Sequence, residues 1–159
     1  MTALKRSLLP PERDNHGDRI VVEARAITST GHVVEHGARV VSPVERYLKR
    51  GQLTGRQGNA AERLYRAWAT GVAGAKLEAP GCVSYSPSGW ADAQIQARRV
   101  YEAARDHVGG RLWPLVFHVC CMDWTVERFA NDAGRNSTST MEVLRYALDM
   151  VADSMGLAE

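Results

Sequence analysis

A few histidine and cysteine side chains have spacings at which metal or nucleophilic chemistry is possible. His32 and His36 are four residues apart, which would place both on one helix face as metal ligands. The glycines and valines around them argue against a helix, so we expect no zinc site there. His118, Cys120 and Cys121 lie in or beside an apolar segment, where buried cysteine acts as a small hydrophobic side chain. These residues favour a core role over catalysis.

The sequence also lacks the motifs of common enzymes and cofactor-binding proteins. It contains no CxxC pair, no phosphate-binding loop and no dinucleotide motif. The paired carboxylates Glu102 and Asp106 fall on an expected solvent-exposed helix face. We therefore expect no catalytic residue, no metal, no cofactor and no small-molecule substrate, and predict that the protein is not an enzyme.

Binding of phosphate and base edges is the chemistry that the sequence favours. The candidate DNA-binding residues near the C-terminus are Arg135, Asn136, Ser137, Thr138, Ser139, Thr140 and Arg145. Hydroxyl and amide side chains at a helix N-terminus can reach phosphates and bases, and the N–H groups there favour an anion. A second candidate contact is the basic face of an expected helix, with Arg46, Lys49 and Arg50.

Charge is unevenly distributed, although the formal net charge is only +2. Basic residues outnumber acidic ones between Arg39 and Arg66, whereas acidic residues outnumber basic ones after Arg111. A phosphate footprint is therefore expected on the middle of the chain, with an ordinary solvated basic helix face as the alternative. The acids of the final helix oppose DNA binding, because phosphate neutralisation supplies much of the affinity.

A helix-turn-helix is predicted for Val126 to Arg145. Ala130 is the small residue where the two helices cross, and Gly134, four residues later, supplies the left-handed turn. Ser137 or Thr138 is expected to cap the second helix. A three-helix packing unit or a protein-contacting module fits the same pattern.

The other expected elements are helices bounded by caps and glycines. Ser42, Pro43 and Glu45 indicate a capping box that opens a helix ending at Gly51. Further helices are expected from about Gly58 to Gly71, from about Ala91 to Val108, and from about Leu112 with Pro114 in its first turn. The helix from about Ala91 to Val108 is expected to bury Ala93, Ala97, Val100, Ala104 and Val108.

These elements predict a mainly α protein. Residues 1–18 are read as a flexible arm and 19–159 as a single helical domain, in which 111–159 form the helix-turn-helix unit. β-Branched residues suggest a short hairpin within 19–41, and a glycine- and proline-rich loop is expected before about Gly89. The sequence shows no membrane span and no signal-peptide core, and its three cysteines form no disulfide framework, so a cytoplasmic location is expected.

From about Val41 to Leu157 the chain resembles an uncharacterised alphaproteobacterial domain of phage-like regulators, including activators of gene-transfer-agent clusters. The stretches that carry the resemblance are 42–48 (SPVERYL), 61–64 (AERL), 92–99 (DAQIQARR) and 144–157 (LRYALDMVADSMGL). The C-terminal part also looks like the promoter-reading helix-turn-helix of sigma factors and phage late regulators. The resemblance implies a transcription regulator that activates or antiterminates phage-like genes through contacts to DNA and RNA polymerase. A protein-binding adaptor or inhibitor without direct DNA contact is the alternative.

Overall fold

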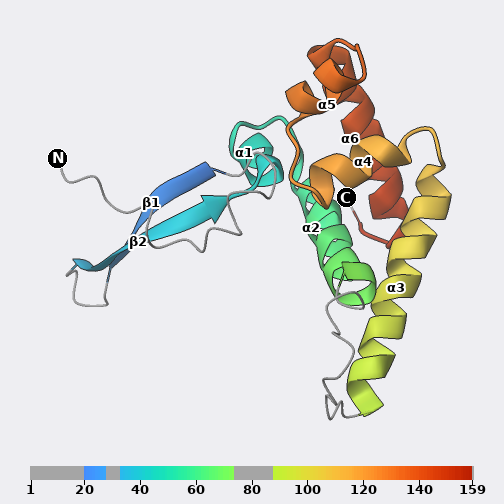
Figure 1. Cartoon of the computed structure of the whole chain (residues 1–159), viewed down its shortest axis with the longest axis horizontal. Helices are drawn as coiled ribbons and strands as arrows, with labels where there is room; N and C mark the ends of the chain where they lie inside the picture. Colours follow the sequence, from blue (N-terminus) through green and yellow to red (C-terminus); the bar gives the residue numbers. More distant parts are fainter. Residues whose placement is uncertain (1–19, 28–32, 74–87, 159) are drawn as a thin grey trace.

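The computed structural model describes residues 20–27, 33–73 and 88–158, and the side chains of 41–73 and 92–158. Within these ranges the chain is mainly helical, as predicted (Figure 1). The predicted arm at residues 1–18, His32 and most of the predicted loop before Gly89 lie outside the described residues.

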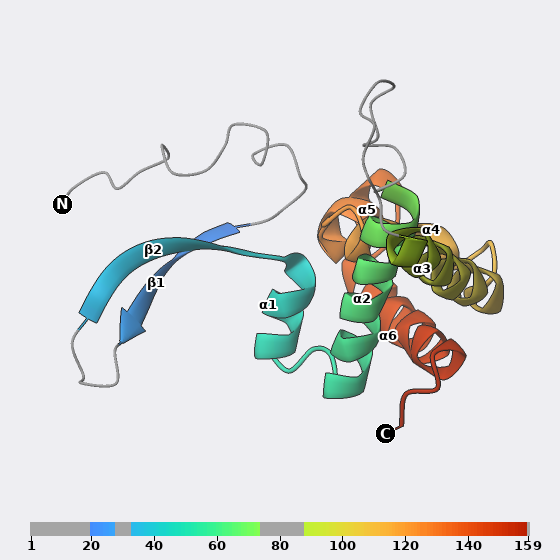
Figure 2. The same cartoon turned by 90° about the horizontal axis from the view of Figure 1, so that it is seen from below.

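Two antiparallel strands precede the helices. β1 (Ile20–Ile27) pairs with β2 (Val33–Val41), so that Ile20 lies opposite Val41. Figure 1 and Figure 2 both show these strands to one side of the helices. β2 leads through Ser42 directly into the first helix.

The first helix, α1 (Pro43–Lys49), starts and stops where the sequence predicts. The Ser42 hydroxyl accepts a hydrogen bond from the Glu45 N–H (3.2 Å), and Gly51 has a φ of +69° just after the helix end. A left-handed φ of this kind costs glycine little, so the chain can turn sharply here. Tyr47 is buried, whereas Lys49 is exposed, which confirms the predicted two-sided character of this helix.

The second helix, α2 (Gly55–Trp68), begins three residues earlier than predicted. Thr54 and Gln57 form a complete capping box: the Thr54 hydroxyl accepts from the Gln57 N–H at 3.2 Å, and the Gln57 side-chain oxygen accepts from the Thr54 N–H at 3.0 Å. This reciprocal pair satisfies N–H groups that a helix otherwise leaves open. The helix then continues into a π-helical turn, η3 (Ala69–Ala73).

The core is built around the last helix, α6 (Ser137–Ser154), which contacts α2, α3 (Ser88–Val108), α4 (Trp113–Cys120) and α5 (Val126–Asp132). The side chains buried completely at its centre are Leu64, Val116, Val119, Leu144, Leu148 and Val151. Truncating a buried leucine of this kind to alanine typically costs about 2–5 kcal/mol. Cys120 and Cys121 are buried in the same cluster, as expected for small hydrophobic side chains.

The buried face of α3 differs in part from the prediction. Ala104 and Val108 are buried as expected, but Ala93 is exposed and Val100 is 41% exposed. Tyr101 is buried instead, with its ring edge-to-face against Trp113 at a centroid distance of 5.2 Å. Figure 1 shows the first turns of α3 extending beyond the end of α2, so this part of the helix has less to pack against.

Gly71 allows η3 to approach α3 closely. A Cβ atom at this position would lie 2.4 Å from the backbone nitrogen of Arg98 and 2.7 Å from its Cα. Because these are backbone atoms, no side-chain rotation can relieve the clash. The two elements are therefore in contact through their backbones.

We predict that Gly71→Ala lowers the free energy of unfolding by about 1–3 kcal/mol, because η3 and α3 must separate. Gly55→Ala is the matched control, since a Cβ there meets no atom within 4 Å; it should be neutral or slightly stabilising. Urea unfolding of both variants measures the difference. A Gly71→Ala protein as stable as the parent would contradict the close packing of η3 on α3.

Candidate nucleic-acid interface

The predicted helix-turn-helix is present in α5 and α6. Gly134 has a φ of +64°, the left-handed conformation expected for the turn. The Arg135 N–H donates to the Ala130 carbonyl at 2.7 Å, which closes the turn onto the end of α5. Ala130 is completely buried where the helices meet. The Ala130–Gly134 spacing therefore gave the geometry of this turn correctly.

The preceding helix supports this pair. α4 contacts both α5 and α6, and its residues Leu115, Val116 and Val119 are buried. Phe129 and Val143 are partly buried and pack against the same core. α4, α5 and α6 thus form a three-helix unit that holds the start of α6 at the surface.

Asn136 caps α6, whereas the sequence analysis expected Ser137 or Thr138 in this role. Its side-chain oxygen accepts hydrogen bonds from the Thr138 N–H (2.8 Å) and the Ser139 N–H (3.2 Å). Two of the N–H groups that could bind an anion are therefore already occupied. The side-chain NH₂ of Asn136, which is exposed, is the group suited to an outside partner.

Two of the predicted contact residues bind other groups of the protein. Thr140 is only 3% exposed, and its hydroxyl donates to the Asn136 carbonyl at 2.7 Å. That hydrogen bond explains how threonine occupies a position where an apolar residue is commoner. Arg145 is half-buried; it donates through Nε to the Gln52 carbonyl at 2.6 Å and forms an ion pair with Glu142. Their side-chain polar groups are therefore engaged within the fold, which leaves them less available to DNA than the neighbouring residues.

The remaining candidates at the start of α6 are accessible. Arg135, Asn136, Thr138 and Ser139 are exposed, and Ser137 is half-buried. Together they form what we call the α6 tip, residues 135–139. It combines one cation with hydroxyl and amide groups, which suits contacts to phosphates and base edges.

The second predicted contact is the basic face of α1 and its end. Lys49 and Arg50 are exposed, whereas Arg46 is half-buried. Lys49 forms an ion pair with Glu45 at 3.4 Å, and its side chain is 61% exposed. A pair this exposed contributes roughly 0–1 kcal/mol, so a phosphate can compete for Lys49.

Tyr47 connects this basic helix to the helix-turn-helix. Its hydroxyl oxygen accepts from the Val126 N–H at 2.8 Å and donates to the Glu127 carboxylate at 3.2 Å. Burial raises the pKa of Tyr47 to about 12, and Glu127 contributes to the rise, although the Val126 hydrogen bond opposes it. The spacing of Tyr47 in α1 indicates an apolar contact but not this pair of hydrogen bonds. The missed signal is that a buried tyrosine hydroxyl usually finds a polar partner.

The acids of α6 are paired within the protein. Arg56 binds Asp153 at 2.5 Å and Asp149 at 3.5 Å, and the Gln57 amide donates to Asp149 at 3.2 Å. Asp149 is also about 18 Å along the helix axis from Ser137. That separation exceeds the Debye length of about 8–10 Å at moderate salt. Asp149 and Asp153 therefore oppose DNA at the α6 tip less than the sequence suggested, whereas Glu142 lies within about 8 Å of Ser137 along the helix axis.

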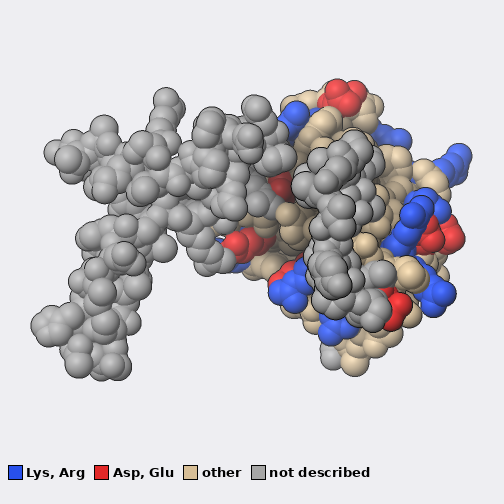
Figure 3. Space-filling view, turned by 60° about the horizontal axis from the view of Figure 1, so that its bottom comes forward, with Lys and Arg blue, Asp and Glu red and all other residues tan. Residues whose placement is uncertain are grey.

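Charges of both signs are mixed among the coloured residues of the face that Figure 3 presents. Figure 3 shows Lys and Arg side chains next to Asp and Glu side chains across the face it presents, with no continuous basic field. On this face, a phosphate contact would therefore have to be local.

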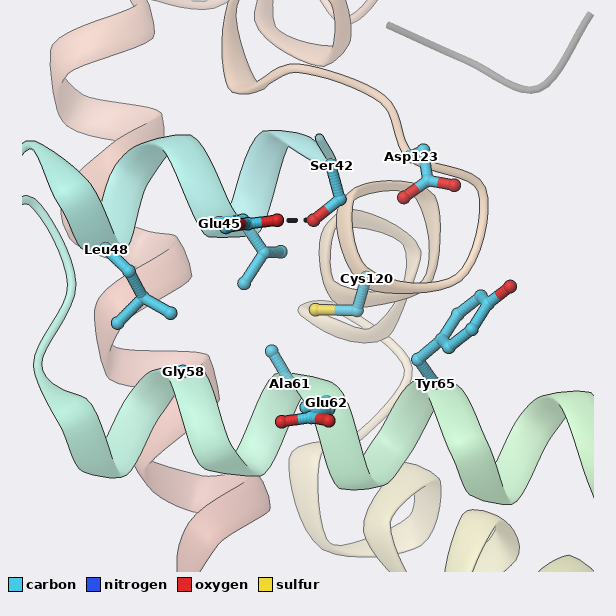
Figure 4. A pocket seen from close by; sticks show the side chains of 10 residues that line it. Ser42, Glu45, Leu48, Gly58, Ala61, Glu62, Tyr65, Cys120 and Asp123 are labelled. Atoms are coloured by element: carbon cyan, nitrogen blue, oxygen red, sulfur yellow. Dashed lines mark hydrogen bonds between the residues drawn. The ribbon is translucent and has the colours of Figure 1, made fainter. Parts of the chain in front are cut away.

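A groove of about 460 Å³ lies between α1 and α2 and extends to the end of α4 (Figure 4). Its ionisable lining includes Glu45, Glu62 and Asp123, so it does not suit a phosphate. Burial, assisted by Asp123, raises the pKa of the Cys120 thiol to about 12. The thiol is therefore protonated at neutral pH and is no ready nucleophile. Among the residues with described side chains, no three His, Cys, Asp or Glu are placed to hold a metal ion.

No protein-family model matches the chain, and neither a curated protein nor a solved structure is significantly similar to it. Within the described part of the chain, no helix is long and apolar enough to cross a membrane.

We predict that Gly134→Val lowers the free energy of unfolding by about 1–2 kcal/mol, because valine resists a left-handed φ. A Cβ at Gly134 meets no atom within 4 Å, so the cost comes from the backbone conformation alone. Gly134→Asn is the control, since asparagine adopts this conformation more readily. Thermal unfolding of the two variants should separate them; equal melting temperatures would show that the turn has another conformation.

We predict that Tyr47→Phe costs about 1–3 kcal/mol at neutral pH, because the buried Val126 N–H loses its partner. The pKa of Tyr47 is raised in the folded protein from 10.0 to about 12, so its neutral hydroxyl stabilises the fold below about pH 10. That contribution is lost as the pH rises from about 10 through about 12. Urea unfolding at several pH values across this range should show that the difference in free energy of unfolding between the parent and Tyr47→Phe becomes smaller as the pH rises. A difference that stays constant would contradict the role of this hydroxyl.

Proposed function

We propose that the protein is a transcription regulator of phage-like or gene-transfer-agent genes that activates or antiterminates through contacts to DNA and RNA polymerase. The observation that supports this most directly is the helix-turn-helix, with Gly134 in its left-handed turn and an exposed polar α6 tip. The resemblance of residues 41–157 to phage-like regulators supplies the class of genes and the polymerase partner.

In this proposal the α6 tip enters the major groove of DNA. The side-chain NH₂ of Asn136 and the hydroxyls of Thr138 and Ser139 contact base edges, while Arg135 contacts a phosphate. Lys49 and Arg50 on α1 bind the DNA backbone without reading sequence. Ordering of the tip by its own cap reduces the entropy lost on binding.

The alternative function is a protein-binding adaptor or inhibitor that does not touch DNA. It is favoured by the internal use of two arginines, because Arg56 and Arg145 both bind groups of the protein itself. Because these two arginines bind groups within the protein, fewer cationic side chains are available to DNA phosphates than the sequence alone suggests.

Asn136→Asp separates the two functions. Aspartate caps a helix as well as asparagine does, so the fold should be kept. The substitution removes the NH₂ donor proposed to contact a base edge and adds a negative charge that the DNA phosphates on either side of the groove repel. We expect its affinity for duplex DNA to fall by about tenfold or more at low salt. Gln96→Glu is the matched control, because it makes the same charge change at an exposed position of α3. Fluorescence anisotropy on duplexes chosen by in vitro selection with the parent protein gives the affinities.

The basic face is tested with Lys49→Ala and Arg50→Ala together. Affinity should fall to a similar extent on all duplexes, and the salt slope should shrink by about two units. If this double variant and Asn136→Asp bind DNA like the parent while activation of a reporter promoter is lost, the DNA contact is wrong and the adaptor function replaces it.

A further inference from the structure

The structure leaves an apolar face of α3 without a covering element among the described residues. Val100 is 41% exposed, Ala103 is exposed, and Ala97 is half-buried. The helical spacing of Val100 and Ala97 is that of a buried stripe, and the sequence analysis expected them in the core. Exposed apolar surface of this kind is characteristic of interaction sites.

This face forms one wall of a groove of about 550 Å³ between α2, α3 and the end of α6. Met155, at the end of α6, also lines the groove. Methionine is flexible and polarisable, so it adapts to the shape of an incoming apolar side chain. Both α3 and the end of α6 therefore contribute apolar side chains to the groove.

Three arginines line the same groove: Arg63 and Arg66 from α2, and Arg99 from α3. Arg66 forms an ion pair with Glu62. Arg63 and Arg99 are exposed, and neither forms an ion pair within the described part of the chain. Arg63 and Arg99 thus contribute positive charge to the groove that no acid among the described residues pairs with.

We propose that this groove, between α2, α3 and the end of α6, is a docking site for an acidic amphipathic helix of a partner protein. An apolar floor with cationic edges is complementary to a helix that has an apolar stripe flanked by carboxylates. Single-stranded nucleic acid fits less well, because the lining residues include no aromatic ring on which an unpaired base would stack.

The groove lies far from the α6 tip. Ser137 begins α6 and Met155 caps its other end, a separation of about 27 Å along the helix axis. DNA at one end and a helix at the other can therefore be bound at the same time. The docking site would serve the partner contact of the proposed function, but it does not depend on DNA binding.

The experiment uses a fluorescent synthetic helical peptide of about 20 residues, long enough to span about 30 Å. The peptide has leucine on one stripe and glutamate elsewhere, and a second version has glutamine in place of glutamate. We expect the glutamate peptide to bind the full chain about tenfold more tightly than the glutamine peptide. Arg63→Ala with Arg99→Ala should weaken it about five- to tenfold. Arg98→Ala with Arg111→Ala is the matched control, because it removes two exposed arginines outside the lining and should change binding less than about twofold.

Three outcomes would overturn the proposal. The first is equal binding of the two peptides, and the second is equal weakening by the groove pair and the control pair. The third is loss of duplex DNA binding in the groove variant to the same extent as in Asn136→Asp, which would make these arginines phosphate contacts. Normal DNA binding combined with lost peptide binding in the groove variant supports the proposal. It also shows that the docking site and the DNA contact can fail independently. Circular dichroism confirms that each variant is folded.

Discussion

Leu144, Leu148 and Val151 of α6 are completely buried, and α2 is among the helices that cover them. A polar seam runs beside this contact, where Gln57 and Arg56 of α2 bind Asp149 and Asp153 of α6. The apolar contact supplies most of the free energy of packing α2 on α6. The polar seam fixes how the two helices are rotated and how far each is shifted along its axis relative to the other. The other elements are positioned relative to this pair: α3 packs against both helices, and α4 packs against both from another side.

The position of the helix-turn-helix follows from that arrangement. α6 extends from the core to the α6 tip, so the tip is held by the same residues that stabilise the protein. Tyr47 then holds α1 against the first residue of α5 through the Val126 N–H. The two candidate DNA contacts are thus joined by a buried hydrogen bond and not by a long loop, which keeps their spacing fixed.

Local signals in the sequence predicted the parts of the fold that local chemistry decides. Ser42 and Gly51 bound α1, and Gly134 forms the turn, because capping and a left-handed φ depend on only a few neighbouring residues. The cap of α6 could not be assigned in the same way, since Asn136, Ser137 and Thr138 are all good capping residues. The buried face of α3 was ambiguous as well, because its alanines fit more than one rotation of the helix. Only the tertiary packing of Tyr101 distinguishes between these rotations.

The candidate site was the least predictable part, because its charges depend on distant partners. Arg145 is held by Gln52, which is 93 residues away in sequence, and no local pattern indicates such a pair. What remains for DNA is a small set of cations, chiefly Arg135, Lys49 and Arg50. Three phosphate contacts correspond to a salt slope of about −3, far from the steep dependence of a strong DNA-binding protein. If the proposed function is right, so modest a DNA contact gains from a second contact to another protein, because binding of one partner raises the effective concentration of the other. The wide separation of the α6 tip from the arginine-lined groove is the geometry that such joint binding requires.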